Sequence, residues 1–212
     1  GEGGIRPLGR DALVALRRIA DEAGVLLVFD AVQCGIGRTG HFFAHEPTGI
    51  APDILASAKA IGGGFPLGAC LATEEAASGM VPGTHGSTYG GNALACAIGN
   101  AVLDDVLADG FLAEVREKAR DLNQRLAGLV DGAPDVFETV RGEGLMVGLK
   151  CRAPAGEVVA AARAEGLLSV PAGDNTMRLL PPLVASESDL TAGVEKLSAA
   201  AARVAADGAG AA

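Results

Sequence analysis

Apolar runs in the first half of the chain are separated by segments of helical periodicity. Apolar or small residues recur at helical spacing over residues 11–23, which predicts a surface helix. Five apolar residues, 25–29, then precede Asp30, and a second apolar run over residues 54–58 stops at Lys59. Uninterrupted apolar runs are typical of strands buried in a parallel sheet. The pattern predicts an α/β unit whose strands deliver Asp30 and Lys59 to the carboxyl edge of the sheet, where open α/β folds place ligands.

The rest of the chain alternates shorter strands and helices. A turn is expected at Arg141-Gly142, and a capping-box-like sequence at residues 186–189 starts the last helix. The expected helices cover residues 93–108, 111–130, 157–165 and 186–206, and the remaining expected strands cover 67–73, 136–140, 144–150, 167–170 and 177–180. We place a domain boundary near Asp109-Gly110, which leaves a compact α+β unit after it.

Composition narrows the class of protein. A net charge of −9, a pI near 4.8 and 49% hydrophobic residues indicate a globular protein and argue against a general nucleic-acid or acidic-membrane surface. No apolar run has transmembrane length and no signal segment is recognisable, so we expect a cytoplasmic protein that is not membrane-bound. The four cysteines are widely separated and have no histidine at metal-ligand spacing, so we expect no metal site.

A glycine-rich motif follows the first strand. Residues 35–40 match G-x-G-x-x-G, which in dinucleotide-binding folds opens a helix packed on the strand. The residues after the motif show no helical periodicity and soon reach Pro47, which favours a glycine-rich loop. His41 and His45 stand four residues apart in this non-helical segment, and we interpret them as loop histidines rather than metal ligands.

Two basic residues at strand positions leave alternatives open. Lys59 either reaches solvent at the strand end or is a desolvated amine that forms a Schiff base with a carbonyl cofactor. It precedes the glycines at 62–64, whereas the lysine of a phosphate-binding P-loop follows its glycines. Arg178 lies in an apolar strand before two prolines. It either faces solvent on an edge strand or faces inward, where a guanidinium suits a substrate carboxylate.

The segment 83–92 adds a third part of a site. It places the hydroxyls of Ser87 and Thr88 and several glycines just ahead of an expected helix, where N–H and O–H donors can bind a phosphate. A buried strand-end carboxylate, a strand-end lysine and a phosphate-binding segment are the parts that a pyridoxal phosphate enzyme needs. The carboxylate keeps the pyridine nitrogen protonated, and the lysine holds the cofactor and later moves the proton.

Four ordered motifs resemble those of class III (ornithine-type) aminotransferases. They are Gly1-Glu2-Gly3-Gly4, Phe29-Asp30-Ala31-Val32-Gln33 with Gly37-Arg38-Thr39-Gly40, Ala58-Lys59-Ala60 with Gly62-Gly63-Gly64-Phe65-Pro66, and residues 83–92. Within that class the chain is most similar to the acetylornithine aminotransferases of arginine biosynthesis. The resemblance implies an α/β fold of type I. Residues 1–109 would be the C-terminal part of a large cofactor-binding domain with a mostly parallel sheet, and residues 110–212 the small α+β domain.

The resemblance also implies roles for the residues of the cofactor site. Lys59 would be the Schiff-base lysine, Asp30 the partner of the pyridine nitrogen, and Gln33 a neighbour of the ring hydroxyl of pyridoxal 5'-phosphate. Ser87 and Thr88 would reach the phosphate of the other subunit's cofactor. The resemblance also implies a homodimer with active sites shared at the subunit interface.

Substrate recognition is implied by a second pair. Glu2 and Arg178 match a glutamate–arginine pair in which the arginine accepts a substrate carboxylate. Two positions depart from the family pattern, because Ala31 replaces a usual glutamate and Ala93 a usual proline. The chain begins within the first motif, so we expect it to be the C-terminal portion of a longer protein.

The function expected from these features is transamination of small amino acids and 2-oxo acids. Glutamate and 2-oxoglutarate would exchange the amino group with N-acetylornithine or its semialdehyde in a ping-pong reaction. The alternatives are another class III enzyme that uses pyridoxal phosphate, such as an ornithine or other omega-amino acid aminotransferase or an aminomutase, and an inactive truncated fragment.

Overall fold

The chain forms two compact units. The structure, a computed structural model, describes residues 1–210. One unit is Leu8–Leu112, and the other combines Gly1–Pro7 with Ala113–Ala212. The domain ranges expected from the sequence, 1–109 and 110–212, stay a prediction. Among the helices of residues 1–210, none combines the length and the hydropathy needed to cross a membrane.

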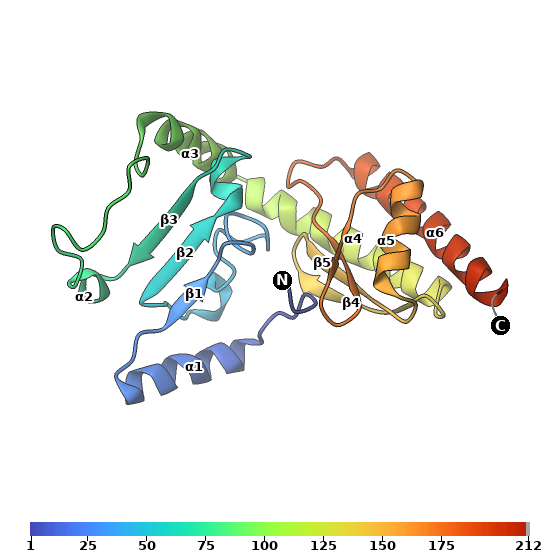
Figure 1. The fold of residues 1–212 in the computed structure, drawn as a ribbon, viewed down its shortest axis with the longest axis horizontal. Helices are drawn as coiled ribbons and strands as arrows, with labels where there is room; N and C mark the ends of the chain where they lie inside the picture. Colours follow the sequence, from blue (N-terminus) through green and yellow to red (C-terminus); the bar gives the residue numbers. More distant parts are fainter. Residues whose placement is uncertain (211–212) are drawn as a thin grey trace. The chain divides into compact units, whose positions relative to one another are not determined.

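The unit Leu8–Leu112 is built on a three-stranded sheet in the order β1-β2-β3 (Figure 1). Its elements are α1 (Arg10–Ala23), β1 (Val28–Asp30), η1 (Glu46–Thr48), β2 (Ile54–Ala58), η2 (Lys59–Gly62), β3 (Gly68–Ala72), α2 (Glu74–Ala77) and α3 (Ala93–Val106). β1 and β2 are parallel, whereas β3 is antiparallel to β2. The strands that lead to Asp30 and Lys59 are therefore neighbours, but only one of the two strand pairs in this sheet is parallel.

The first strand is shorter and less buried than its apolar sequence predicts. β1 begins at Val28, and the side chains of Val25, Leu26 and Val28 are each more than half exposed. Within residues 1–210, β1 pairs only with β2, so it is an edge strand with one neighbour. The prediction of a buried strand over residues 25–29 is wrong for this chain. The strand nevertheless brings Asp30 to the end of the parallel pair, where the residue is exposed and not buried as the sequence predicted.

A charged contact fastens α1 to the sheet. Arg17 Nη1 donates to Asp53 Oδ2 at 2.8 Å, and the same oxygen accepts the backbone N–H of Leu27 at 2.6 Å. The Leu27 N–H and the Arg17 guanidinium hold the pKa of Asp53 below its usual value of 3.8. Asp53 thus ties the helix to the segments that enter β1 and β2.

We expect Asp53→Asn to lower the thermal unfolding midpoint of the full-length protein by a few degrees at pH 7. The amide can accept the Leu27 N–H but cannot pair with the charge of Arg17. Because folding lowers the pKa of Asp53, its stabilising effect is complete above the unfolded value of 3.8 and is lost as the pH falls below it. Calorimetry should therefore show a smaller difference from wild type at pH 3 than at pH 7. Equal differences at both pH values, or the same loss in the exposed control Asp104→Asn, would contradict this assignment.

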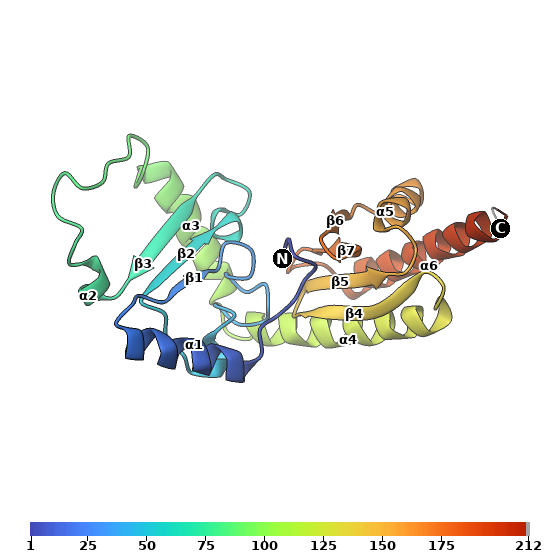
Figure 2. The same ribbon diagram turned by 60° about the horizontal axis from the view of Figure 1, so that its bottom comes forward.

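The second unit has a four-stranded antiparallel sheet in the order β4-β5-β7-β6. Its elements are α4 (Phe111–Gly132), β4 (Phe137–Glu143), β5 (Met146–Cys151), α5 (Ala155–Ala164), β6 (Val170–Ala172), β7 (Thr176–Leu179) and α6 (Glu187–Gly210). Figure 2 shows α4 running beside β4 and β5. One face of the inner strands is apolar and buried: Val147, Leu149, Met177 and Leu179. The other face carries Gly148 opposite Arg178 and Lys150 opposite Thr176.

The β4–β5 hairpin corrects one expectation. Arg141-Gly142 is not a turn, because β4 continues to Glu143 and Arg141 lies opposite Gly148. Gly142 has a φ of 129°, and a Cβ there would meet the carbonyl oxygen of Met146 at 2.1 Å. The close approach of the two strands thus requires this glycine, and the turn itself lies at residues 144–145.

Two other expected boundaries differ from the structure. The strand expected at 167–170 lies instead at Val170–Ala172, and the last helix continues past residue 206 to Gly210. The start of that helix is confirmed. Ser186 Oγ accepts the backbone N–H of Asp189, and Asp189 Oδ2 accepts the backbone N–H of Ser186, as in a capping box.

Candidate active site

Asp30 and Lys59 come from adjacent parallel strands at the same edge of the sheet. Asp30 lies opposite Ala56 in the β1–β2 register, and Lys59 follows Ala56 by three residues. The Ala31 N–H donates to the carbonyl oxygen of Ala56 at 2.8 Å, which extends the pairing one step beyond β1. Asp30 Oδ1 accepts the backbone N–H of Val32 at 2.9 Å, so the carboxylate is oriented by the turn that follows it.

Lys59 adopts an unusual backbone conformation. Its φ is 54°, a left-handed value that costs a residue other than glycine about 1–3 kcal/mol. Close packing between η2 and α3 holds the turn in place. A Cβ on Gly63 would lie 2.8 Å from Val102 Cγ2, and a Cβ on Gly99 would lie 2.8 Å from Leu67 Cδ2. Such strain persists only where the surroundings fix it, and it is frequent at active sites.

The environment of Lys59 differs in part from the sequence prediction. The residue is exposed, not desolvated as one of the two interpretations proposed. Ser57, two residues earlier on β2, is 3% exposed, and its hydroxyl has no hydrogen-bond partner within residues 1–210. A buried hydroxyl without a partner is costly. The sequence pointed to Lys59 but gave no signal for Ser57.

The remaining residues expected to bind the cofactor lie in turns and loops. Gln33 is half-buried in the turn that follows Asp30. Ser87 and Thr88 are in the exposed loop between α2 and α3, where Ser87 Oγ accepts the backbone N–H of Gly90 at 2.9 Å. No hydrogen bond between this loop and Asp30 or Lys59 is present in the described part of the chain. The loop precedes α3. Asn92 caps the first turn of this helix, because its Oδ1 accepts the backbone N–H of Ala95.

The other unit contains the expected glutamate–arginine pair. Arg178 Nη1 donates to Glu2 Oε1 at 2.8 Å. The Arg178 side chain is only 12% exposed, whereas that of Glu2 is 73% exposed. β7 is an inner strand, since it lies between β5 and β6, and this overturns the alternative of a surface arginine on an edge strand. The pairing offers a guanidinium that a carboxylate other than that of Glu2 could also bind.

Comparison with known proteins identifies the family. The sequence profile of the family described as Aminotransferase class-III matches residues 1–201. The chain belongs to the class-III aminotransferases. Two curated relatives of this class-III chain are named acetylornithine aminotransferase, one from Agrobacterium fabrum and one from Rhodobacter capsulatus, and each is 61% identical over 202 residues. Each match covers 95% of this chain and 51% of the relative, so the chain spans about half the length of the curated relatives that it matches.

Solved structures support the class-III fold. The crystal structure of N-acetylornithine aminotransferase from Stenotrophomonas maltophilia matches with a TM-score of 0.88 at 34% identity, over 98% of this chain and 55% of that one. An ornithine aminotransferase from Toxoplasma gondii matches with a TM-score of 0.89 at 29% identity, over 98% of this chain and 50% of that one. That structure reveals partial occupancy of pyridoxal phosphate at its own active site.

Proposed function

We propose that the protein is an acetylornithine aminotransferase that uses pyridoxal 5'-phosphate. It would transfer an amino group between glutamate and 2-oxoglutarate on one side and N-acetylornithine and its semialdehyde on the other. The observation that carries the proposal is the placement of Asp30 and Lys59 at one edge of the parallel pair β1–β2 in a chain of this family. Relatives with that name at 61% identity support the choice of substrate.

The residues at this edge fit the cofactor. Lys59 offers an exposed amine for a carbonyl carbon, and Asp30 offers a carboxylate for the ring nitrogen. Ser57, two residues before Lys59, adds a buried hydroxyl that has no hydrogen-bond partner among the described residues. An amine, a carboxylate and a spare hydroxyl are the donor and acceptor types that an aldehyde-bearing pyridine requires.

Each residue of the site would have a definite task. When bound, pyridoxal phosphate supplies an electron sink for the pair of electrons left when the substrate carbon loses a proton. Asp30 would hold the proton on the ring nitrogen, because an adjacent negative charge favours the protonated base. Lys59 Nζ would hold the cofactor and then accept and return the proton of the substrate carbon. Gln33 would lie near the ring hydroxyl, and Arg178 would bind a substrate carboxylate.

The proposal extends to the architecture of the full-length protein. The class-III relatives are about twice as long as this chain, so the three-stranded sheet would be part of a larger, mostly parallel sheet of fold type I. Ser87 and Thr88, in a wholly exposed loop, would contact the phosphate of the other subunit's cofactor. This arrangement requires a homodimer with shared active sites. We also propose a cytoplasmic location.

A second candidate is an ornithine aminotransferase. Solved structures of that name match with TM-scores as high as 0.90, close to those of the acetylornithine enzymes. Sequence identity favours the first candidate. It is 34% and 32% for two solved acetylornithine aminotransferases, against 27% and 29% for two Toxoplasma gondii ornithine aminotransferase structures.

The full-length protein should form glutamate from 2-oxoglutarate when N-acetylornithine is the amino donor. We expect kcat/KM for N-acetylornithine to exceed that for ornithine by about 10-fold or more, because a site built for a neutral acetamide must desolvate the extra ammonium of ornithine. Coupled detection of glutamate measures both rates. A preference for ornithine would support the second candidate, and no glutamate from either donor would exclude both.

A further inference from the structure

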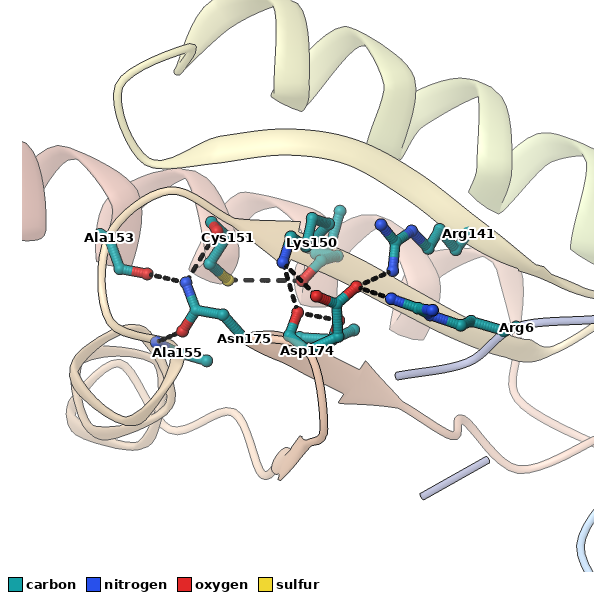
Figure 3. Close-up of polar contacts among 10 residues, drawn as sticks. Arg6, Arg141, Lys150, Cys151, Ala153, Ala155, Asp174 and Asn175 are labelled. Carbon is teal, nitrogen blue, oxygen red and sulfur yellow. Dashed lines mark hydrogen bonds and ion pairs between the residues drawn. The ribbon is translucent and has the colours of Figure 1, made fainter. Parts of the chain in front are cut away.

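Three cationic side chains converge on the single carboxylate of Asp174 (Figure 3). The guanidinium groups of Arg6 and Arg141 both donate to Asp174 Oδ2. Lys150 Nζ donates to Asp174 Oδ1 and to the Asp174 carbonyl oxygen, each at 2.7 Å. Arg6 belongs to the N-terminal segment, Arg141 to β4 and Lys150 to β5. Asp174 therefore joins the N-terminal segment to the β4–β5 hairpin, which lies more than a hundred residues further along the chain.

The turn that carries Asp174 is fixed independently of this carboxylate. Asp174 and Asn175 both have left-handed backbones, with φ values of 52° and 47°. Asn175 Nδ2 donates to the carbonyl oxygens of Cys151 and Ala153, and its Oδ1 accepts the N–H of Ala155. These bonds hold the β6–β7 turn against the end of β5 and the start of α5. The position of the Asp174 carboxylate is thus fixed by its backbone, and the side chains of Arg6, Arg141 and Lys150 reach it there.

The contacts of Asp174 help to hold the N-terminal segment Gly1–Pro7 in place. The N–H of Gly173 donates to the carbonyl oxygen of Glu2 at 2.7 Å. Ile5 is 2% exposed and packs over Gly148, where a Cβ would come within 2.9 Å of the Ile5 side chain. Arg6, next to Ile5, reaches Asp174. The segment is therefore attached at Glu2, at Ile5 and at Arg6.

This attachment fixes the backbone of Glu2 beside Arg178. Gly148, the residue under Ile5, lies opposite Arg178 in the β5–β7 register. The Glu2 carboxylate reaches Arg178 at 2.8 Å although its side chain is 73% exposed. An exposed carboxylate keeps such a contact most of the time only if its backbone is held nearby. The attachment of the backbone sets the effective concentration of the carboxylate near the guanidinium.

We propose that Asp174 is a positioning residue that sets substrate selectivity through the Glu2–Arg178 pair. The inference rests on the proposed function. A substrate with a carboxylate on its reacting carbon, such as glutamate, must displace Glu2 from Arg178. A substrate whose reacting carbon bears no carboxylate, such as N-acetylornithine, leaves the pair intact. By holding Glu2 in place, Asp174 disfavours the first kind of substrate relative to the second.

The charge of Asp174 is what holds the cluster together. The hydrogen bonds from Lys150, Arg141 and Arg6 hold the pKa of Asp174 far below its usual range, so it is anionic at neutral pH. Without that charge, three cations would face each other and Arg6, 62% exposed, would turn to solvent. The N-terminal segment would then lose its attachment at Arg6 and would open more often.

The test uses the full-length protein and two variants that change the net charge in opposite directions. Asp174→Asn preserves the left-handed backbone, which asparagine tolerates, and removes a negative charge. Arg6→Gln removes a positive charge from the exposed end of the same contact. We expect both variants to raise the ratio of kcat/KM for glutamate to kcat/KM for N-acetylornithine, by about 10-fold and about 3-fold respectively.

A second readout needs no catalysis. Hydrogen exchange of the amides of Gly4, Ile5 and Gly173, which donate within the segment or to it, should be about 10-fold faster in Asp174→Asn. The control Arg120→Gln, at a side chain that is 77% exposed on α4, should change neither exchange nor selectivity.

The outcomes separate the inference from the proposed function. Faster exchange together with a raised ratio in both variants supports it. Unchanged hydrogen exchange overturns the inference, and so does faster exchange with an unchanged ratio of the two kcat/KM values. Opposite shifts of that ratio in the two variants also overturn it, because they would indicate that the net charge attracts glutamate over a long range. A wild-type protein that uses neither substrate contradicts the proposed function itself, before any variant is compared.

Discussion

Replacing Lys59 by alanine should lower kcat for transamination by about 10⁵-fold, the scale seen when a residue that carries the covalent step is removed. The Lys59 amine has two proposed tasks, holding the cofactor and moving the proton of the substrate carbon, and alanine performs neither. The strained turn is expected to survive, because it is fixed by the packing of Gly63 and Gly99 and not by the lysine side chain. Steady-state glutamate formation by the full-length protein measures the effect.

The matched control is Lys196→Ala. Lys196 is an exposed lysine on α6 whose amine donates to the carbonyl oxygen of Gly166, and its loss should leave kcat within about twofold of wild type. If Lys59→Ala kept more than about 1% of the wild-type rate, another amine would have to hold the cofactor and move the proton. The assignment of Lys59 would then be wrong.

Removing the charge of Asp30 should have the second largest effect. Asp30→Asn is expected to lower kcat by about 10²–10³-fold, the size observed when one preorganised electrostatic partner is removed from an active site. The asparagine oxygen can still accept the Val32 N–H that Asp30 Oδ1 accepts, so the turn after β1 should keep its shape. The loss is then due to the charge that would keep the ring nitrogen protonated.

Two comparisons make the Asp30 result specific. Asp30→Glu keeps the charge with a longer reach and should recover part of the lost rate, whereas Asp104→Asn, an exposed position on α3, should not differ from wild type. Rates for Asp30→Asn within about threefold of wild type would show that the carboxylate has no electrostatic role in the reaction.

The parallel pair at the centre of the site could be predicted because its signals are local. Each strand is an apolar run that ends at one charged residue, and parallel neighbours end at the same edge of a sheet. Burial could not be predicted in the same way. Val28 is apolar but more than half exposed, since β1 has a single neighbouring strand among residues 1–210, and the number of neighbours is not encoded in a strand's own sequence.

Long-range pairs of charged residues were beyond sequence reasoning. Arg6 and Asp174 are 168 positions apart, and Arg17 and Asp53 are 36 apart, so no spacing rule brings them together. The orientation of Arg178 could not be predicted from its own segment either, because it depends on the strand order β4-β5-β7-β6, which makes β7 an inner strand. The resemblance to a known family identified Glu2 and Arg178, but nothing in their own segments indicated the contact.

The most direct test of the central assignment is where the cofactor is attached. The full-length protein would be saturated with pyridoxal phosphate, reduced with borohydride so that the cofactor stays on the amine that holds it, digested and mapped by mass spectrometry. We predict the added mass on the peptide that contains Lys59, at about one cofactor per chain. Attachment to Lys118, Lys150, Lys196 or any other lysine, or no attachment at all, would contradict it.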